Sequence, residues 1–138
     1  MIKLNSNQNK IFNYINTRPS GSYYIPMNRC DGKTTICKKL LESSDYYNII
    51  CSRQAIVRYN YDDHKNVYNI SNLPRHDTHN ESVIIDDFHG LNLYRFDCLS
   101  HVFDRTFFLG NTNDIMFDKK NIMRKIIKIK ANMNGWDN

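Results

Sequence analysis

Hydrophobic residues recur along the chain in short runs that alternate between the spacing of helices and the spacing of strands. Helical spacing covers Leu4–Asn16 and Lys33–Ser43, and a third helical segment lies around Tyr94–Phe103. Short apolar runs predict strands at Tyr23–Pro26, Tyr46–Ser52, Asn66–Ile70, Val83–Ile85 and Thr106–Leu109. Because strands alternate with helical stretches, we expect an α/β fold: a mostly parallel sheet with helices on both faces.

The segment Asp118–Met133 fits two patterns. Its isoleucines include a set at helical spacing, and others alternate with lysines as they do in a strand. We expect a helix from about Lys119 that gives way to a last strand near Ile126–Ala131. Residues 73–81 form a polar loop, and no repeat or linker divides the 138 residues. The pattern therefore predicts one minimal domain spanning residues 1–138.

Composition excludes several classes of protein. The 41% hydrophobic and 12% aromatic content is typical of a folded chain, and no apolar run is long enough for a membrane helix or an export signal. The four cysteines form no C-x-x-C pair, so a zinc ribbon is not expected. Frequent Asn, Ile, Tyr and Lys indicate AT-rich codons, as in many phages, large DNA viruses and some bacteria. We expect a cytoplasmic protein without membrane contacts, in the host cytoplasm if the gene is viral.

The sequence Gly32-Lys33-Thr34-Thr35 follows a predicted strand and opens a predicted helix. Phosphate binding needs N–H groups at a helix N-terminus, a lysine for the outer phosphates and a hydroxyl for Mg²⁺. These residues match the end of the P-loop pattern G-x-x-x-x-G-K-[ST], with Met27 in place of the first glycine. Methionine does not adopt the backbone conformations of glycine cheaply. The alternative for so short a match is the solvated start of a helix.

A second motif lies further along the chain, at Val83-Ile84-Ile85-Asp86-Asp87. It has the form of a Walker B strand, which delivers carboxylates to the ligand-binding edge of a parallel sheet. We predict that Asp86 binds Mg²⁺ together with Thr34, and that Asp87 activates the attacking water as general base. The alternative is a strand that ends in a turn with solvated aspartates. In this order and about 50 residues apart, the two motifs favour a site for ATP and Mg²⁺.

A third motif, Leu109-Gly110-Asn111-Thr112-Asn113, ends the last predicted apolar strand with polar residues. Some P-loop ATPases insert a strand between the P-loop strand and the Walker B strand, and polar residues at its end sense the γ-phosphate. We therefore predict that Asn111 or Asn113 contacts the γ-phosphate or the attacking water. The alternative is an ordinary turn.

Two segments resemble the large terminase subunits of tailed phages, the ATPases that drive DNA into capsids. Arg29-Cys30-Asp31-Gly32-Lys33-Thr34-Thr35 is similar to their deviant Walker A loop, R-x-x-G-K-[ST]-[ST], which often lacks the first glycine. The resemblance implies that this whole loop binds ATP, with Arg29 acting beside Lys33 at the phosphates. Leu4–Ile11 is similar to the L-x-x-x-Q-x-x-I segment of terminases and of superfamily 1 and 2 helicases, which implies that Gln8 contacts adenine.

The chain also departs from these families. They usually carry Asp-Glu at the end of Walker B, where this chain has Asp86-Asp87. The shorter second carboxylate would bring the water closer or slow hydrolysis. At 138 residues we expect a minimal RecA-like or ASCE-like core rather than a complete terminase or a two-domain helicase. The resemblance also implies a helper arginine from a neighbouring subunit, for which Arg95, Arg105 and Arg124 are candidates.

The net charge of +5 favours an anionic partner, and many of the basic residues lie in the segment Lys119–Lys130. We expect double-stranded nucleic acid as a partner, with a homo-oligomer or other motor or viral subunits as further partners. A solvated basic face is the alternative. Two other functions stay open: a weak or inactive P-loop descendant that binds nucleotide or DNA, and a small nucleotide kinase. The spacing His76-x-x-His79 fits a polar loop better than a metal site.

Overall fold

The structure is a computed structural model that describes residues 2–27, 32–73, 77–78, 80–86, 91–111, 113, 115, 118–122 and 124. The helices with defined bounds in this part of the chain are α1 (Ser6–Thr17), α2 (Lys33–Ser43), α3 (Gln54–Tyr61) and α4 (Leu93–Val102). The strands are β1 (Gly21–Pro26), β2 (Tyr47–Cys51), β3 (Val67–Asn69), β4 (Ser82–Ile85) and β5 (Arg105–Gly110). None of the helices among these residues has the length and apolar character needed to cross a membrane.

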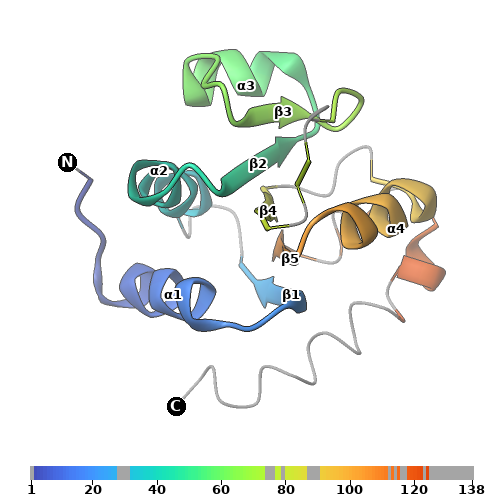
Figure 1. The fold of residues 1–138 in the computed structure, drawn as a ribbon, viewed down its shortest axis with the longest axis horizontal. Helices are drawn as coiled ribbons and strands as arrows, with labels where there is room; N and C mark the ends of the chain where they lie inside the picture. Colours follow the sequence, from blue (N-terminus) through green and yellow to red (C-terminus); the bar gives the residue numbers. More distant parts are fainter. Residues whose placement is uncertain are drawn as a thin grey trace.

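The strands form one parallel sheet in the order β1-β5-β4-β2-β3. Helices α1 and α2 lie on one side of the sheet and α4 lies on the other (Figure 1). The α/β class, the parallel sheet and the cover on both faces are therefore confirmed. The last of these strands in the sequence, β5, lies between β1 and β4.

The apolar runs become strands because the sheet is buried from both sides. Every residue of β2 and β4 is buried, and so is every residue of β5 after Arg105. Phe108 of β5 stacks on Phe96 of α4 with ring centroids 4.3 Å apart, and Phe107 stacks on Tyr23 of β1 at 5.3 Å. Neighbouring side chains of β5 thus pack toward opposite faces, which requires the continuous apolar sequence typical of parallel strands.

Helix α3 is an element that the sequence pattern does not predict. Its buried residues are Val57 and Tyr61, which are four positions apart and so lie on one face. The helix has eight residues, and an apolar run as short as Ala55-Ile56-Val57 fits a strand as well as a helix, which is why the helix does not stand out in the sequence. The helix ends at Asp62, whose left-handed conformation places its N–H against the carbonyl oxygens of Val57 and Arg58.

The predicted C-terminal helix begins close to its expected position. Residues 119–122 and 124 are helical, and the N–H of Ile122 donates to the carbonyl oxygen of Asp118 at 3.0 Å. The Asp118 carboxylate accepts from the N–H of Leu93 at 3.1 Å, which joins this segment to the start of α4. The last strand, expected near Ile126–Ala131, lies outside the described residues.

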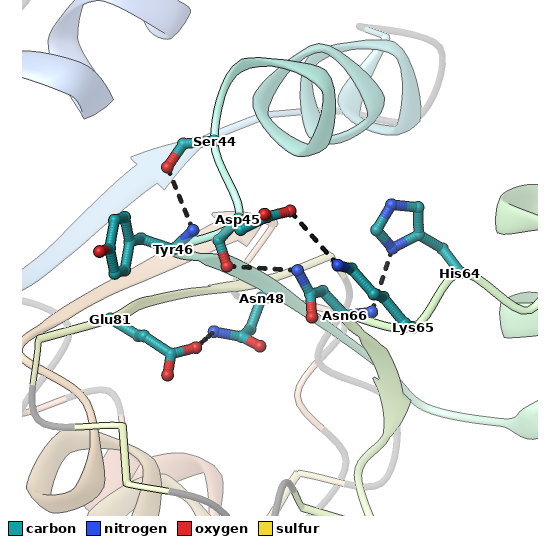
Figure 2. A network of polar contacts seen from close by, with 8 residues as sticks. All are labelled: Ser44, Asp45, Tyr46, Asn48, His64, Lys65, Asn66 and Glu81. Atoms are coloured by element: carbon teal, nitrogen blue, oxygen red, sulfur yellow. Dashed lines mark hydrogen bonds and ion pairs between the residues drawn. The ribbon is translucent and has the colours of Figure 1, made fainter.

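Polar contacts connect the loops that precede β2, β3 and β4 (Figure 2). The Asn66 side chain donates to the carbonyl oxygen of Asp45 at 3.2 Å, and the Lys65 ammonium forms an ion pair with the Asp45 carboxylate at 3.6 Å. Asn48 of β2 donates to the Glu81 carboxylate at 2.8 Å. These contacts hold the amino ends of three neighbouring strands together.

Arg105, the first residue of β5, binds several groups at this amino edge. Its guanidinium donates to the carbonyl oxygens of Ile15 at 2.7 Å and Arg18 at 3.2 Å, at the end of α1. It also donates to the hydroxyl groups of Ser82 at 2.8 Å and Tyr47 at 3.1 Å. These contacts contradict the expectation that Arg105 serves a neighbouring subunit as a helper arginine, because its side chain is held within its own chain.

Replacing Arg105 with methionine should lower the free energy of unfolding by about 3 kcal/mol, because several part-buried oxygens lose a charged donor. Urea denaturation followed by circular dichroism measures the change. The matched control is Arg58→Met, since the Arg58 side chain is 65% exposed and forms a surface ion pair with Asp63. That control should cost less than about 0.5 kcal/mol. Equal losses in the two variants would contradict the role of Arg105.

Candidate functional site

Three of the segments that the sequence assigns to the site leave the sheet at one edge. Because the strands are parallel, their carboxyl ends lie together, and Met27 follows β1, Asp86 follows β4 and Asn111 follows β5. β5 pairs with β1 on one side and with β4 on the other. The predicted phosphate loop, metal ligand and γ-phosphate sensor therefore start from three adjacent strands.

Met27 extends β1 and is part of the core. Its N–H donates to the carbonyl oxygen of Gly110 at 3.2 Å, and its side chain is buried. The same carbonyl oxygen accepts from the Tyr24 hydroxyl at 2.9 Å. At the position of the usual first glycine, this chain therefore has an apolar residue that continues the pairing of β1 with β5.

The start of α2 is suited to an anion. Gly32 is the N-cap residue with φ +82°, a left-handed conformation that glycine adopts without steric cost. The first turn contains Lys33, Thr34 and Thr35, all half-buried, and no acidic residue. The N–H groups of a first helical turn have no partner within the helix and carry its positive dipole end. The helices α1 and α4 begin differently, with an asparagine side chain as the cap.

Gln8, predicted from the family resemblance to contact adenine, lies against the phosphate-loop residue Gly32. A Cβ atom built on Gly32 would collide with Nε2 of Gln8. The other end of the Gln8 amide belongs to a capping box: Oε1 accepts from the N–H of Asn5 at 3.0 Å, and the Asn5 side chain accepts from the N–H of Gln8 at 2.9 Å. The structure thus brings Gln8 to the loop, with its carbonyl oxygen bonded inside α1.

Asp86 lies in the interior, 5% exposed, and its N–H continues the pairing of β4 with β2 through the carbonyl oxygen of Ile50 at 3.1 Å. Its Oδ2 accepts a hydrogen bond from the Tyr61 hydroxyl at 2.7 Å. Tyr61 is the last residue of α3 and is likewise 5% exposed. The predicted metal ligand therefore has a buried donor from a helix that the sequence pattern does not predict.

Cys37 links the start of α2 to Asp86. Burial, together with the Asp86 carboxylate, raises the pKa of the Cys37 thiol well above its usual range, while a hydrogen bond with Tyr61 and, more weakly, the Lys33 ammonium act in the opposite direction. Cys37 thus lies within electrostatic reach of both Lys33 and Asp86. Burial, followed by the neighbouring Cys37 and Asp86, also raises the pKa of the Tyr61 hydroxyl. Both groups stay protonated at neutral pH and act as neutral hydrogen-bonding groups.

The other described candidates lie around this edge. Asn111 is half-buried, and its Oδ1 accepts from the N–H of Asn113 at 2.9 Å, which closes a turn after β5. Arg95 lies in the first turn of α4, and its guanidinium donates to the Ser71 hydroxyl at 3.4 Å, beyond the carboxyl end of β3. Arg124 is exposed in the C-terminal helical segment. Arg95 and Arg124 therefore stay candidates for the helper arginine.

Several predicted site residues lie outside the described part of the chain. His76 and His79 of the predicted polar loop also lie there, and the predicted site residues are Arg29, Cys30, Asp31 and Asp87. Their roles stay predictions.

The oxygen donors of Thr34 and Asp86 fit magnesium in its usual protein setting. Among the residues that the structure describes, no group of three or more His, Cys, Asp or Glu side chains could hold a metal ion. Magnesium is usually bound by one or two carboxylates, with phosphate oxygens and water completing its coordination. A threonine hydroxyl and an aspartate carboxylate are thus oxygen donors of the kind that a Mg²⁺ ion bound with a nucleotide would use.

Comparison with known proteins identifies no family. No protein-family model matches the sequence, and a search of curated proteins finds no significant match. The resemblance to terminases therefore depends on the short sequence motifs.

Gly32→Ala should lower the free energy of unfolding by about 2 kcal/mol, because alanine is strained at this φ and its Cβ displaces Gln8. Gln8→Ala should cost about 1 kcal/mol through loss of its part of the capping box. The double variant should also cost about 2 kcal/mol, since the collision no longer occurs. Urea denaturation of the wild-type protein, the two single variants and the double variant measures the free energies of unfolding of this double-mutant cycle. Strictly additive losses of stability would show that Gln8 does not contact the loop.

Proposed function

We propose that the protein is a Mg²⁺-dependent, ATP-binding P-loop ATPase with a RecA-like (ASCE) arrangement, resembling a minimal terminase-like or helicase-like core that acts on DNA. The observation that carries this proposal is the strand order. β5 lies between β1, which leads to Gly32-Lys33-Thr34, and β4, which ends at Asp86. This is the order expected of ATPases that insert a strand between the P-loop strand and the Walker B strand. Chance matches to two short motifs have no reason to fall in this order.

Each described residue has a role that its position supports. Lys33 and the N–H groups at the start of α2 bind the β- and γ-phosphates, and Gly32 lets the backbone approach them. Thr34 and Asp86 would hold magnesium, which, when bound, neutralises charge that develops on the transferred phosphoryl group. The Asn111 oxygen already accepts a hydrogen bond from its own turn, so its amide NH₂ is the group suited to a phosphate oxygen.

For two residues outside the described part of the chain, Asp87 and Arg29, the proposed roles are supported by sequence motifs. Asp87 takes the proton of the attacking water as general base, and Arg29 contacts the phosphates together with Lys33. The exposed side chains of Lys119, Lys120 and Arg124 provide a basic surface for the phosphate backbone of duplex DNA.

A second candidate is a nucleotide-binding descendant without turnover. The specific observation that favours it is Met27, which is buried in the extended β1 where an active loop has its first glycine. Such a protein keeps Lys33, Thr34 and the start of α2 for binding. The two candidates agree on nucleotide affinity and differ on hydrolysis.

Lys33→Ala should weaken ATP binding by about 2 kcal/mol, or roughly 30-fold, because a charge-assisted phosphate contact is lost. Isothermal titration calorimetry with Mg²⁺ measures the affinity. The matched control is Lys38→Ala, an exposed lysine of the same helix, which should change the affinity by less than about twofold. Wild-type affinity in the Lys33 variant would refute the phosphate site.

Asp87→Asn should abolish ATP turnover and keep binding of Mg·ATP, because the amide cannot accept the proton of the attacking water. Steady-state phosphate release, with and without duplex DNA, measures turnover. The control is Asp97→Asn, an exposed aspartate of α4, which should retain the wild-type rate. Nucleotide binding without turnover in the wild-type protein would support the second candidate, and a rate unaffected by DNA would remove the argument for a DNA-dependent motor.

A further inference from the structure

We propose that Tyr61 is a positioning residue that orients the Asp86 carboxylate for the divalent cation. The inference deepens the proposed function and rests on it, because it concerns the ion that Asp86 is proposed to bind. Its basis is a hydrogen bond of 2.7 Å from the Tyr61 hydroxyl to Oδ2 of Asp86, between two side chains that are each 5% exposed.

Because both side chains are buried, loss of this hydrogen bond would cost more free energy than loss of a hydrogen bond at the surface. A carboxylate in the interior needs donors to offset its lost hydration, and hydrogen bonds to charged acceptors are the strong ones. The Tyr61 hydroxyl binds one particular oxygen, Oδ2, so the two carboxylate oxygens are no longer equivalent. Rotation of the carboxylate about its terminal bond would break the contact. Tyr61 thus restricts the orientation of the carboxylate plane.

The backbone of Tyr61 is held in place by the end of helix α3. Tyr61 is the last residue of α3, and the next residue, Asp62, adopts a left-handed conformation that closes the helix with backbone hydrogen bonds. The side chain also lines a cavity of about 270 Å³ together with Lys38 and Leu41 of α2. Replacing Tyr61 with phenylalanine removes the hydroxyl contact with Asp86 and keeps the ring.

A merely structural role is the competing account, in which the hydroxyl pairs a buried charge and has no effect on metal binding. Tyr24 is the matched control. It is 4% exposed, and its hydroxyl donates at 2.9 Å to the backbone oxygen of Gly110, at the same edge of the sheet. Tyr24→Phe therefore removes a comparable buried hydrogen bond that does not involve Asp86.

The experiment measures the affinity for a non-hydrolysable ATP analogue by calorimetry, once with Mg²⁺ and once with EDTA. Tyr61→Phe should weaken binding about tenfold with Mg²⁺ and by less than about twofold with EDTA, since residues that orient metal ligands typically affect metal affinity by 10- to 100-fold. Tyr24→Phe should show no such difference between the two conditions. In an Asp86→Asn background, Tyr61→Phe should have no further Mg²⁺-dependent effect.

Equal weakening with Mg²⁺ and with EDTA, or no weakening at all, would overturn the positioning role and leave the nucleotide site intact. If the wild-type protein and Asp86→Asn each bind equally well with and without Mg²⁺, the metal site of the proposed function fails, and this inference fails with it. Thermal melting checks that each variant folds. As a test on the wild-type protein, adding Mg²⁺ to the nucleotide complex should move the ¹³Cζ signal of Tyr61 and leave that of Tyr24; an unmoved Tyr61 signal would overturn the inference.

Discussion

The parallel pairing of the five described strands is the constraint on which the rest of the structure depends. It directs every strand the same way, so the two edges of the sheet have different neighbours and different chemistry. The amino edge joins the end of α1 to the strands through Arg105, and its loops are connected by Asp45, Lys65 and Asn66. At the carboxyl edge lie the start of α2 and Asp86. Polar groups are concentrated at both edges because the strand interiors are buried on two faces.

The parts of the fold that follow from local patterns could be predicted from the sequence. The helix Lys33–Ser43 coincides with α2, and Val83–Ile85 falls within β4, because apolar spacing and the flanking polar residues act over a few positions. Helix α3 could not be predicted in this way, because it has eight residues and its short apolar run fits a strand as well as a helix. The sequence likewise does not show which arginine side chain is available to a partner subunit. The Arg105 guanidinium forms hydrogen bonds within its own chain.

In the candidate site, too, some features follow from local sequence motifs and others depend on how distant elements pack. Motifs locate Lys33, Thr34 and Asp86, and the strand order places their segments at one edge. The hydrogen bond from Tyr61 to Asp86 and the contact of Gln8 with Gly32 join residues far apart in the sequence, so they depend on how α3 and α1 pack. Around Asp86 the structure keeps neutral groups: burial raises the pKa of both the Cys37 thiol and the Tyr61 hydroxyl. Cys37 and Tyr61 therefore add no negative charge beside Asp86 at neutral pH.

The pairing of β1 with β5 has a consequence for how the protein is made. β1 is the first of the described strands to be synthesised, yet its neighbour in the sheet is the last of them, and β2, β3 and β4 are all made in between. On the ribosome, β1 cannot pair with β5 until residues 105–110 have emerged. Contacts between such distant segments slow folding, and unpaired edges attract other chains. The segment that contains β1 would thus be most exposed to aggregation or chaperone binding just before β5 appears.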